Sequence, residues 1–359
     1  MAFSIDWEGT STLVREKVIP RIKDQFFKKN VLMYLLRPKA EYFTGGTFIR
    51  QPLSFAPEGG GGQWWSGTDR FNMTIRNPFT SATFFSKNFE LPVVVSQDDE
   101  DTVDGPEAFA SLVESKMKIA QRTVMDSLGG ANGVYNDGSN PKAMTGLRYS
   151  LADYTGTGAG TAPTKNYGGI PASATAYTWW NHQGYMGPSG VGNFITGSGS
   201  GGTYIQKANM GPWDDMLTLQ GLAAGKFSTL ILCNYGVWTE ILQMIHAKTQ
   251  WFRPQQDDTL VKAGFESFRY RMLNVVVDPF VPRGTAYGMT AKHEKVYFID
   301  EESVHLWIHT KRDFSFTGFR EGWDQAVRGG HIFFRGELTF DERRSSGVHP
   351  DVDCTATSP

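Results

Sequence analysis

A long two-stranded excursion within residues 45–95 constrains the fold of this chain most. Its turn contains Pro57 and a run of four glycines at 59–62, which permits a tight reversal of the backbone. Isolated hairpins are only marginally stable in water, so we expect this one to lie on another surface. Trp64 and Trp65 follow the glycines, and each ring offers about 150 to 250 Å² for such a contact. The expected strands occupy 47–54, 71–75 and 83–95.

One amphipathic helix is expected over residues 106–128. Pro106 in the first turn and Glu107 beside the helix dipole favour its start, and Gly129 and Gly130 favour its end. Helical spacing places one set of apolar residues on a single stripe, which predicts a helix that packs one face against a core. These residues are Phe109, Leu112, Val113, Met117, Ala120 and Val124.

An acidic run, from Asp98 and Asp99 through Glu100 to Asp101, precedes this helix. The run lacks the glycine and the terminal glutamate of a calcium-binding loop, so the pattern does not indicate a metal site. We expect a solvated acidic turn, or a turn that faces a neighbour's basic arm.

The first 40 residues form a basic arm, with eight Lys and Arg against four Asp and Glu. Apolar residues recur there at helical spacing, and Pro20 is expected to bend or interrupt the helix. We expect a short helix, a kink and a more extended stretch. The arm either crosses to a neighbour, with Arg15 and Arg21 as contacts, or covers the core of its own chain.

The remainder predicts an α+β chain in which early and late segments share one core. Glycine-rich residues 129–211 hold many aromatics, so we expect ordered irregular loops in place of disorder. Helices are expected at 213–222 and 236–248, with strands at 227–233, 275–278, 295–299, 304–309 and 331–339.

Charge and cysteine content exclude several classes of protein. The formal net charge is -2, which gives no global field for nucleic acid. A signal peptide begins with positive charge, whereas this chain has Asp6 and Glu8 in that region. No apolar run approaches the ~18 residues that a membrane span requires. We therefore expect no membrane partner. Cys233 and Cys354 are too few for a disulfide framework and are expected to be thiols.

No pattern predicts an enzyme, a cofactor or a metal site. The glycines at 156–160 lack the spacing and the flanking strand of a dinucleotide loop, and the P-loop and nucleophile-elbow motifs are absent from the sequence. The expected strand at 304–309 places His305 and His309 on the same face, about 13 Å apart. This distance is too long for the two side chains to bind one metal ion.

Several segments in order resemble the Hong-Kong-97-type major capsid proteins of tailed double-stranded DNA phages. They are Gly45-Gly46-Thr47-Phe48-Ile49 before Pro52-Leu53; Gln121-Arg122-Thr123-Val124-Met125-Asp126; Tyr167-Gly168-Gly169-Ile170 with Trp179-Trp180; and Leu273-Asn274-Val275-Val276-Val277-Asp278-Pro279 before Tyr297-Phe298-Ile299-Asp300. Their order and spacing cover nearly the whole chain.

The resemblance implies an amino-terminal arm (1–42), a projecting loop (43–95), a peripheral domain with a spine helix (96–134 and 292–345), an axial domain (135–291) and a carboxyl-terminal tail (346–359). Such subunits form the hexamers and pentamers of an icosahedral phage head, which is assembled in the host cytoplasm. The implied partners are other copies of the chain, a portal, a decoration protein and packaged double-stranded DNA held by nonspecific contacts. Because only about 45 residues precede the loop, a separate scaffolding protein is expected.

Two departures from the archetype of the family predict a noncovalent shell. The archetype links a loop Lys to an Asn near the carboxyl end, whereas the only Lys within 45–95 here is Lys87 and no Asn follows His331. Burial and charge are then expected to join the subunits. The candidate contact residues are Arg15, Arg21, Arg50, Glu58, Trp64, Trp65, Arg70, Arg76, Asp98, Asp99 and Asp101.

Three other interpretations remain open. A bacterial nanocompartment shell shares the fold of the capsid proteins but encloses protein cargo. An enzyme with a glycine-rich loop would need a substrate-sized pocket with convergent titratable groups. A tail or decoration protein is disfavoured by the strong helix at 106–128.

Overall fold

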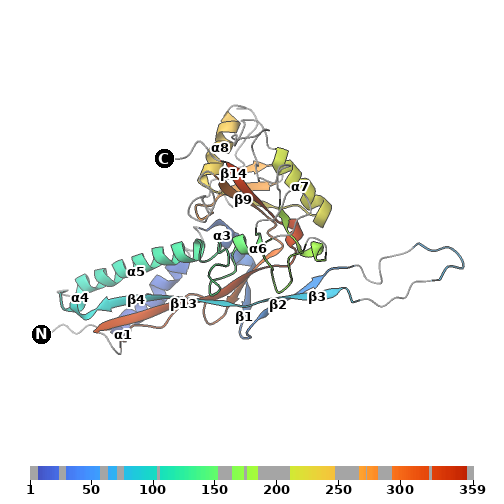
Figure 1. Cartoon of the computed structure of the whole chain (residues 1–359). Helices are drawn as coiled ribbons and strands as arrows, with labels where there is room; N and C mark the ends of the chain where they lie inside the picture. The colour runs from blue at the N-terminus through green and yellow to red at the C-terminus, as the bar shows by residue number, and fades with distance from the viewer. Residues whose placement is uncertain are drawn as a thin grey trace.

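The computed structural model describes residues 7–23, 30–56, 64–70, 77–102, 106–152, 164–173, 176–184, 211–246, 267–271, 273–281, 293–322 and 326–353. The main features of this part of the chain are two mixed sheets, a long helix and a projecting two-stranded hairpin (Figure 1). One apolar core runs from Val14 to Val348 and includes residues of both sheets, so the expectation that early and late segments share a core is confirmed.

The first sheet is organised around one long strand, β13 (Val327–Phe340). Strand β4 (Lys87–Ser96) pairs with its first part and β10 (Val304–His309) with its last part, both antiparallel. The short strands β11 (Ser315–Phe316) and β12 (Arg320–Glu321) also pair with β13, and β1 (Glu41–Phe43) is added parallel to β10.

The second sheet has the strand order β5-β14-β9-β6-β8-β7. Residues of the central strand β6 (Leu230–Cys233) are all buried. Leu230 and Leu232 contact the main core, while Ile231 and Cys233 face a second cluster with helices α7 (Gly211–Ala224) and α8 (Tyr235–His246). Burial on both faces explains the unbroken apolar sequence of β6. The other strands are β5 (Gln183–Gly184), β7 (Ser267–Tyr270), β8 (Leu273–Val277), β9 (His293–Ile299) and β14 (Gly347–Asp353).

Helix α5 (Pro106–Gly129) confirms the predicted amphipathic helix and lies along β4 and β13 (Figure 1). Val113, Met117 and Val124 on its apolar stripe are buried. The acidic residues before it were expected to form a turn, and this was wrong. They form the short helix α4 (Gln97–Thr102), because acids in a first helical turn interact favourably with the helix dipole.

The amino-terminal segment covers the core of its own chain. Helix α1 (Trp7–Leu13) continues into a π-helical turn, η1 (Val14–Val18), and remains helical to Lys23. The π turn lets the helix pass Pro20, which has no backbone N–H to donate. An extended stretch was expected farther on. Residues 31–39 are instead helical, as α3 (Val31–Leu36) and η2 (Arg37–Lys39), because four apolar residues of α3 are buried in the core.

Two strands of the second sheet come from the last part of the chain. β9 pairs with β6, and β14 lies between β5 and β9. The predicted domain bounds stay a prediction. The register of β14 shifts between His349 and Val352, and this bulge accommodates Pro350 within a strand.

The described loops of the glycine-rich region are ordered and partly buried, as expected. Val134, Tyr135, Tyr167 and Trp180 are almost completely inaccessible to solvent. Short helices α6 (Leu147–Ser150), η4 (Thr178–Trp180) and η6 (Arg343–Ser345) connect them to the sheets. Among the described helices, none is both long enough and apolar enough to cross a membrane.

Candidate functional site

The root of the projecting hairpin has one buried and one open face. Strands β2 (Ile49–Ser54) and β3 (Phe79–Phe84) pair antiparallel. Ile49 and Leu53 on β2 are buried, whereas Arg50 between them is exposed, and Phe79 on β3 is also exposed. The alternation matches a two-stranded ribbon that packs against the rest of its chain on one side only.

A tight turn at residues 167–170 holds this root in place. The amide of Thr83 donates to the Gly168 carbonyl at 2.9 Å, and the rings of Phe84 and Tyr167 lie 5.0 Å apart. Gly168 has φ +63°, and a Cβ at this position would lie 2.7 Å from the Cβ of Ala82. Glycine is therefore required here both by the backbone conformation and by the close approach of β3.

The far part of the hairpin presents two indole rings to solvent. Trp64 is 102% exposed and Trp65 is 60% exposed. In Figure 1 the projection carries residues 64–70 away from α5 and from both sheets. Tryptophan is enriched at protein interfaces, where its large ring is buried by a partner. The sequence prediction that these rings need a partner surface stays a prediction, because the structure contains one chain.

The predicted arginine contacts differ in their surroundings. The Arg50 guanidinium lies 4.8 Å above the Phe48 ring, and Arg70 is exposed near the tryptophans. Arg21 is exposed on the amino-terminal helix. Arg15 donates to the carbonyls of Phe316 and Thr317 in its own chain, so its described contacts favour the interpretation in which the arm covers its own core. Glu58 and Arg76 lie outside the described residues.

The acidic helix α4 lies at the opposite end of the molecule from the hairpin (Figure 1). Asp99 pairs with Lys116 at 3.4 Å, while Asp98 and Asp101 are exposed. The structure therefore does not bring the acidic residues together with Arg50 or Arg70 of the same chain. A contact between these groups requires a second copy. No group of His, Cys, Asp and Glu that could hold a metal occurs in the described ranges.

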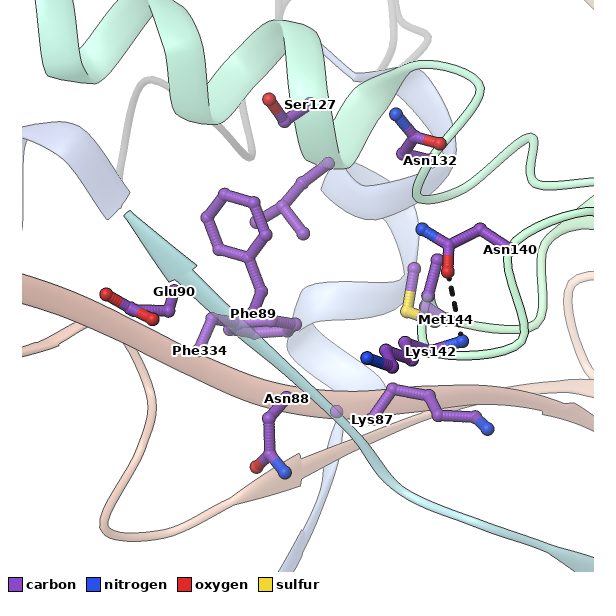
Figure 2. A pocket seen from close by; sticks show the side chains of 13 residues that line it. Lys87, Asn88, Phe89, Glu90, Ser127, Asn132, Asn140, Lys142, Met144 and Phe334 are labelled. Carbon is purple, nitrogen blue, oxygen red and sulfur yellow. Dashed lines mark hydrogen bonds between the residues drawn. The ribbon is translucent and has the colours of Figure 1, made fainter. Parts of the chain in front are cut away.

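A cavity of about 320 Å³ lies between the end of α5, the loop that follows it, and strands β4 and β13 (Figure 2). Leu128, Phe89, Met144 and Phe334 contribute apolar side chains to its lining. Polar side chains from the loop and the helix surround this apolar floor. They include Ser127, Asn132, Asn140 and Lys142.

Several titratable groups have strongly shifted pKa values, but they lie in separate buried contacts. Burial raises the pKa of Glu337 to about 8, and this side chain accepts a hydrogen bond from the Thr145 amide at 2.8 Å. Burial likewise raises the pKa of Asp278 to about 6, and the Tyr135 hydroxyl donates to it at 2.8 Å. Neither group lines the cavity. Each carboxyl instead holds a loop through its hydrogen bond.

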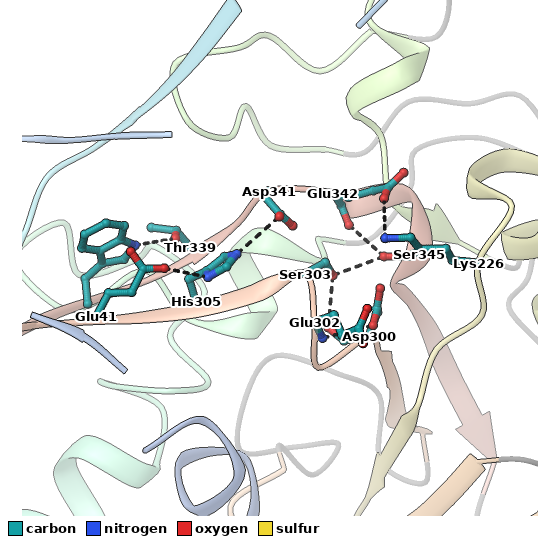
Figure 3. Close-up of polar contacts among 11 residues, drawn as sticks. Glu41, Lys226, Asp300, Glu302, Ser303, His305, Thr339, Asp341, Glu342 and Ser345 are labelled. Carbon is teal, nitrogen blue, oxygen red and sulfur yellow. Dashed lines mark hydrogen bonds and ion pairs between the residues drawn. The ribbon is translucent and has the colours of Figure 1, made fainter. Parts of the chain in front are cut away.

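Sequence reasoning missed two polar clusters near the start of β10. His305 contacts Glu41 at 3.0 Å and Asp341 at 3.3 Å, and nearby Ser303 contacts Ser345 (Figure 3). The hydrogen bond with Asp341 is the main cause that raises the pKa of His305. The only signal in the sequence was the outward position of His305 on an alternating strand, which does not identify its partners.

A buried arginine joins the late chain to the glycine-rich loops, and this contact was also missed. Arg343 lies 4.6 Å from the centre of the Tyr167 ring and contacts Nδ1 of His182 at 2.9 Å. His182 Nε2 lies 2.8 Å from the Ala152 carbonyl, which fits a proton on Nε2. Burial and the nearby guanidinium lower the pKa of His182, so the ring is neutral and accepts at Nδ1.

Comparison with known proteins identifies structural neighbours only. A scan against protein-family models found no match, and a search of curated proteins found none either. Among solved structures, the chain is similar to a chain of the capsid asymmetric unit of cyanophage A-1(L), with a TM-score of 0.58, 14% identity, and coverage of 90% of this chain and 93% of that one.

Two further solved structures give the same result. A chain from the capsid of the native GTA particle has a TM-score of 0.55 and 11% identity, with 88% of this chain and 89% of that one covered. A chain from Mycobacterium phage Ogopogo has a TM-score of 0.50 and 13% identity, with 90% and 92% covered. These likenesses show that the chain has the Hong-Kong-97-type capsid fold that the sequence resemblance implied.

Proposed function

We propose that this chain is the major capsid protein of a tailed double-stranded DNA phage. The observation that carries the proposal is the likeness to a phage capsid chain over about nine-tenths of this chain. The projecting hairpin supports it, because Trp64 on this hairpin is fully exposed in the single chain. An isolated subunit would leave this surface unused, whereas a shell provides neighbours on every side.

In this proposal the subunits form hexamers and pentamers that close into an icosahedral head. Each subunit makes several interfaces, so modest contacts add up to a stable wall. The contacts are heterologous, because the hairpin and α4 lie at opposite ends of one chain. The chain acts as a structural protein and not as an enzyme.

We infer noncovalent joining between subunits. Lys87, the single Lys of the loop, donates to the Pro141 carbonyl of its own chain at 2.7 Å. This hydrogen bond occupies the side chain that a lysine-based link would use. The proposed partners are other copies of the chain, a separate scaffolding protein, a portal, a decoration protein and double-stranded DNA. With a net charge of -2, contacts to DNA would be local and nonspecific.

Electron microscopy of the purified protein tests the proposal directly. The chain would be expressed in a bacterial cytoplasm, alone and together with the scaffolding protein of the same phage. Uniform closed shells are expected in at least one of these conditions. Soluble monomers in both would contradict the function. On a denaturing gel the shells should give one band near 40.0 kDa, and a ladder of larger bands would contradict noncovalent joining.

A further inference from the structure

The cavity beside the end of α5 has the chemistry of a socket for an aromatic ring. Its floor is apolar, and its volume of about 320 Å³ falls at the lower end of the range for ligand pockets. The described side chains around it leave this space open. A hole with an apolar floor and a polar rim favours a partner whose body is apolar and whose edge is polar.

The rim adds features that favour an indole ring. Lys142 is exposed and extends its side chain toward Phe89 and Phe334 (Figure 2). An ammonium group beside the cavity attracts the face of an aromatic ring, and tryptophan gives the strongest attraction of this type. The exposed amide of Asn132 offers an acceptor for the indole N–H.

An acidic segment fits the same cavity less well. Lys87 already donates to the Pro141 carbonyl, and Glu90 adds a negative charge to the lining. A carboxylate that entered the cavity would lie against the apolar floor without a complete set of donors, and burying a charge in this way is costly. An aromatic ring carries no such cost.

The same molecule displays a ring of this type that its own cavity does not take up. Trp64 is fully exposed. It belongs to residues 64–70, which the projection carries away from α5 and both sheets (Figure 1). We propose that Trp64 of one copy of the chain occupies the cavity beside α5 of a second copy. The inference rests on the proposed assembly and specifies one contact within it, with Trp64 as the anchor and Leu128, Phe89 and Lys142 as the principal socket residues.

Such a contact has the geometry that a ring of subunits needs. The anchor and the socket are different surfaces of one chain, so each copy donates one tryptophan and accepts another. A central aromatic anchor in a desolvated pocket is also the common form of an interaction hot spot. The socket lies on rigid elements, since α5 and the β4–β13 pair form two of its walls.

Site-specific disulfide formation tests this placement without removing the anchor. Ser66→Cys places a thiol near Trp64, and Asn132→Cys places one on the rim; both positions are exposed. Cys354→Ser removes a native thiol that lies outside the described residues, and Cys233 is completely buried. Assembled shells of Ser66→Cys/Asn132→Cys are oxidised and separated on a non-reducing gel. A ladder of linked chains is expected.

A matched control replaces only the position on the second surface. Ser111 is exposed on α5, a helix that also bears Ser127 of the socket wall, so Ser66→Cys/Ser111→Cys keeps the hairpin thiol and moves its partner. We expect roughly tenfold less linked chain with this pair, and a similar loss when Trp64→Ala is added to the rim pair, since truncating a hot-spot tryptophan commonly costs at least this much. Trp64→Phe should restore part of the linking.

The outcomes separate this inference from the proposed function. Shells that link equally through Asn132 and Ser111, or that link unchanged after Trp64→Ala, would overturn the socket while leaving the capsid function intact. If Trp64→Ala blocks assembly, the Trp64→Ala/Ser66→Cys chain is mixed as a minority with an excess of the Asn132→Cys chain, which keeps Trp64, and the linking of the minority chain is measured. If the wild-type chain forms no shells under any condition, both proposals fail.

Discussion

His305 Nδ1 lies 3.0 Å from the Glu41 carboxylate, and this contact ties strand β1 to strand β10 by side chains as well as by backbone pairing. Asp341, at the end of β13, lies on the other side of the same ring at 3.3 Å. One imidazole therefore connects three chain segments at the base of the projecting loop.

The first prediction concerns the pH dependence of this contact. The folded pKa of His305 is raised, so its stabilising contribution is present below the unfolded pKa and is lost as pH rises through the folded pKa. His305→Gln should lower the free energy of unfolding by roughly 1 kcal/mol near pH 5.5, with a smaller effect near pH 8.5. Thermal unfolding of the unassembled chain across this range measures it. A difference that does not change with pH would contradict the role of charge.

A second prediction concerns Gly168 at the hairpin root. Gly168→Ala adds a methyl group 2.7 Å from Ala82 and strains the left-handed backbone, which costs about 1 to 2 kcal/mol before the clash is counted. Hydrogen exchange at the Thr83 amide, which is bonded to Gly168, should become faster. Gly169→Ala is the matched control, because φ is +78° but nothing lies within 4 Å of the added Cβ. Equal exchange in both variants would show that the contact with β3 is unimportant.

Glu337 should behave as a neutral side chain near pH 7. Its folded pKa of about 8 lies above the unfolded value, so the folded state holds a proton that the unfolded state has released. The protein should therefore lose stability as pH rises between these values, by at most about 1.4 kcal/mol per pH unit. Glu337→Gln should remove this slope and match the wild type near pH 5. Glu337→Ala should be less stable throughout by about 1 to 3 kcal/mol, since the Thr145 amide loses its acceptor.

The tryptophan pair should affect the assembly and not the subunit. Trp64→Ala with Trp65→Ala is expected to leave the unfolding temperature of the free chain unchanged, because both rings are exposed. Shells of this variant should dissociate at lower denaturant concentration, with a loss of about 2 kcal/mol or more per subunit. Leu222→Ala, also at a highly exposed apolar residue, serves as the control. Shells of unchanged stability would refute the anchor role.

A charge exchange tests the predicted pairing between arginines and acids. Asp98→Lys with Asp101→Lys should slow assembly several-fold, most clearly at low salt, because like charges would then face each other across the interface. Adding Arg50→Glu and Arg70→Glu should restore part of the rate. Asp126→Lys, at an exposed position near the other end of α5, controls for two of the four units of charge that the double substitution adds. Light scattering follows the rates, and the absence of any restoration would count against direct pairing.

Elements with strong local signals were predictable from the sequence. Helix α5 has a complete apolar stripe, strand β10 has strict alternation, and β6 has a short run of apolar residues between glycine-rich turns. In each case the spacing of apolar residues matches the face of the helix or strand that is buried. Because burial of apolar side chains drives folding, this spacing predicts the element. The tight turn at 167–170 was recognised as a motif, but its contact with β3 was not.

The missed features depend on contacts between distant residues. Strand β14 contains Pro350, which local rules disfavour in a strand, and only the pairing with β9 and a bulge make it possible. The run of acidic residues in α4 suggested an exposed turn because like charges repel one another. The attraction of Asp99 to Lys116 and of the acids to the helix dipole favours a helix, and Lys116 is distant in the sequence. The cavity beside α5 and the buried Glu337 arise from the meeting of three segments, so no single segment encodes them.

Strand β13 also has a mechanical consequence. From Val327 opposite Ser96 to Phe340 opposite Val304, neighbouring strands are bonded along its length, so bending it would break backbone hydrogen bonds. We expect β13 to be rigid from the end of the subunit that bears α4 to the contacts around His305. In the proposed shell, rings of five and six demand different curvature. We expect the difference in curvature to be accommodated by backbone rotation in segments outside this sheet, such as the one at Gly46, whose φ is +102°. The shell would then change curvature at the projecting loops, while the sheet of each subunit keeps its shape.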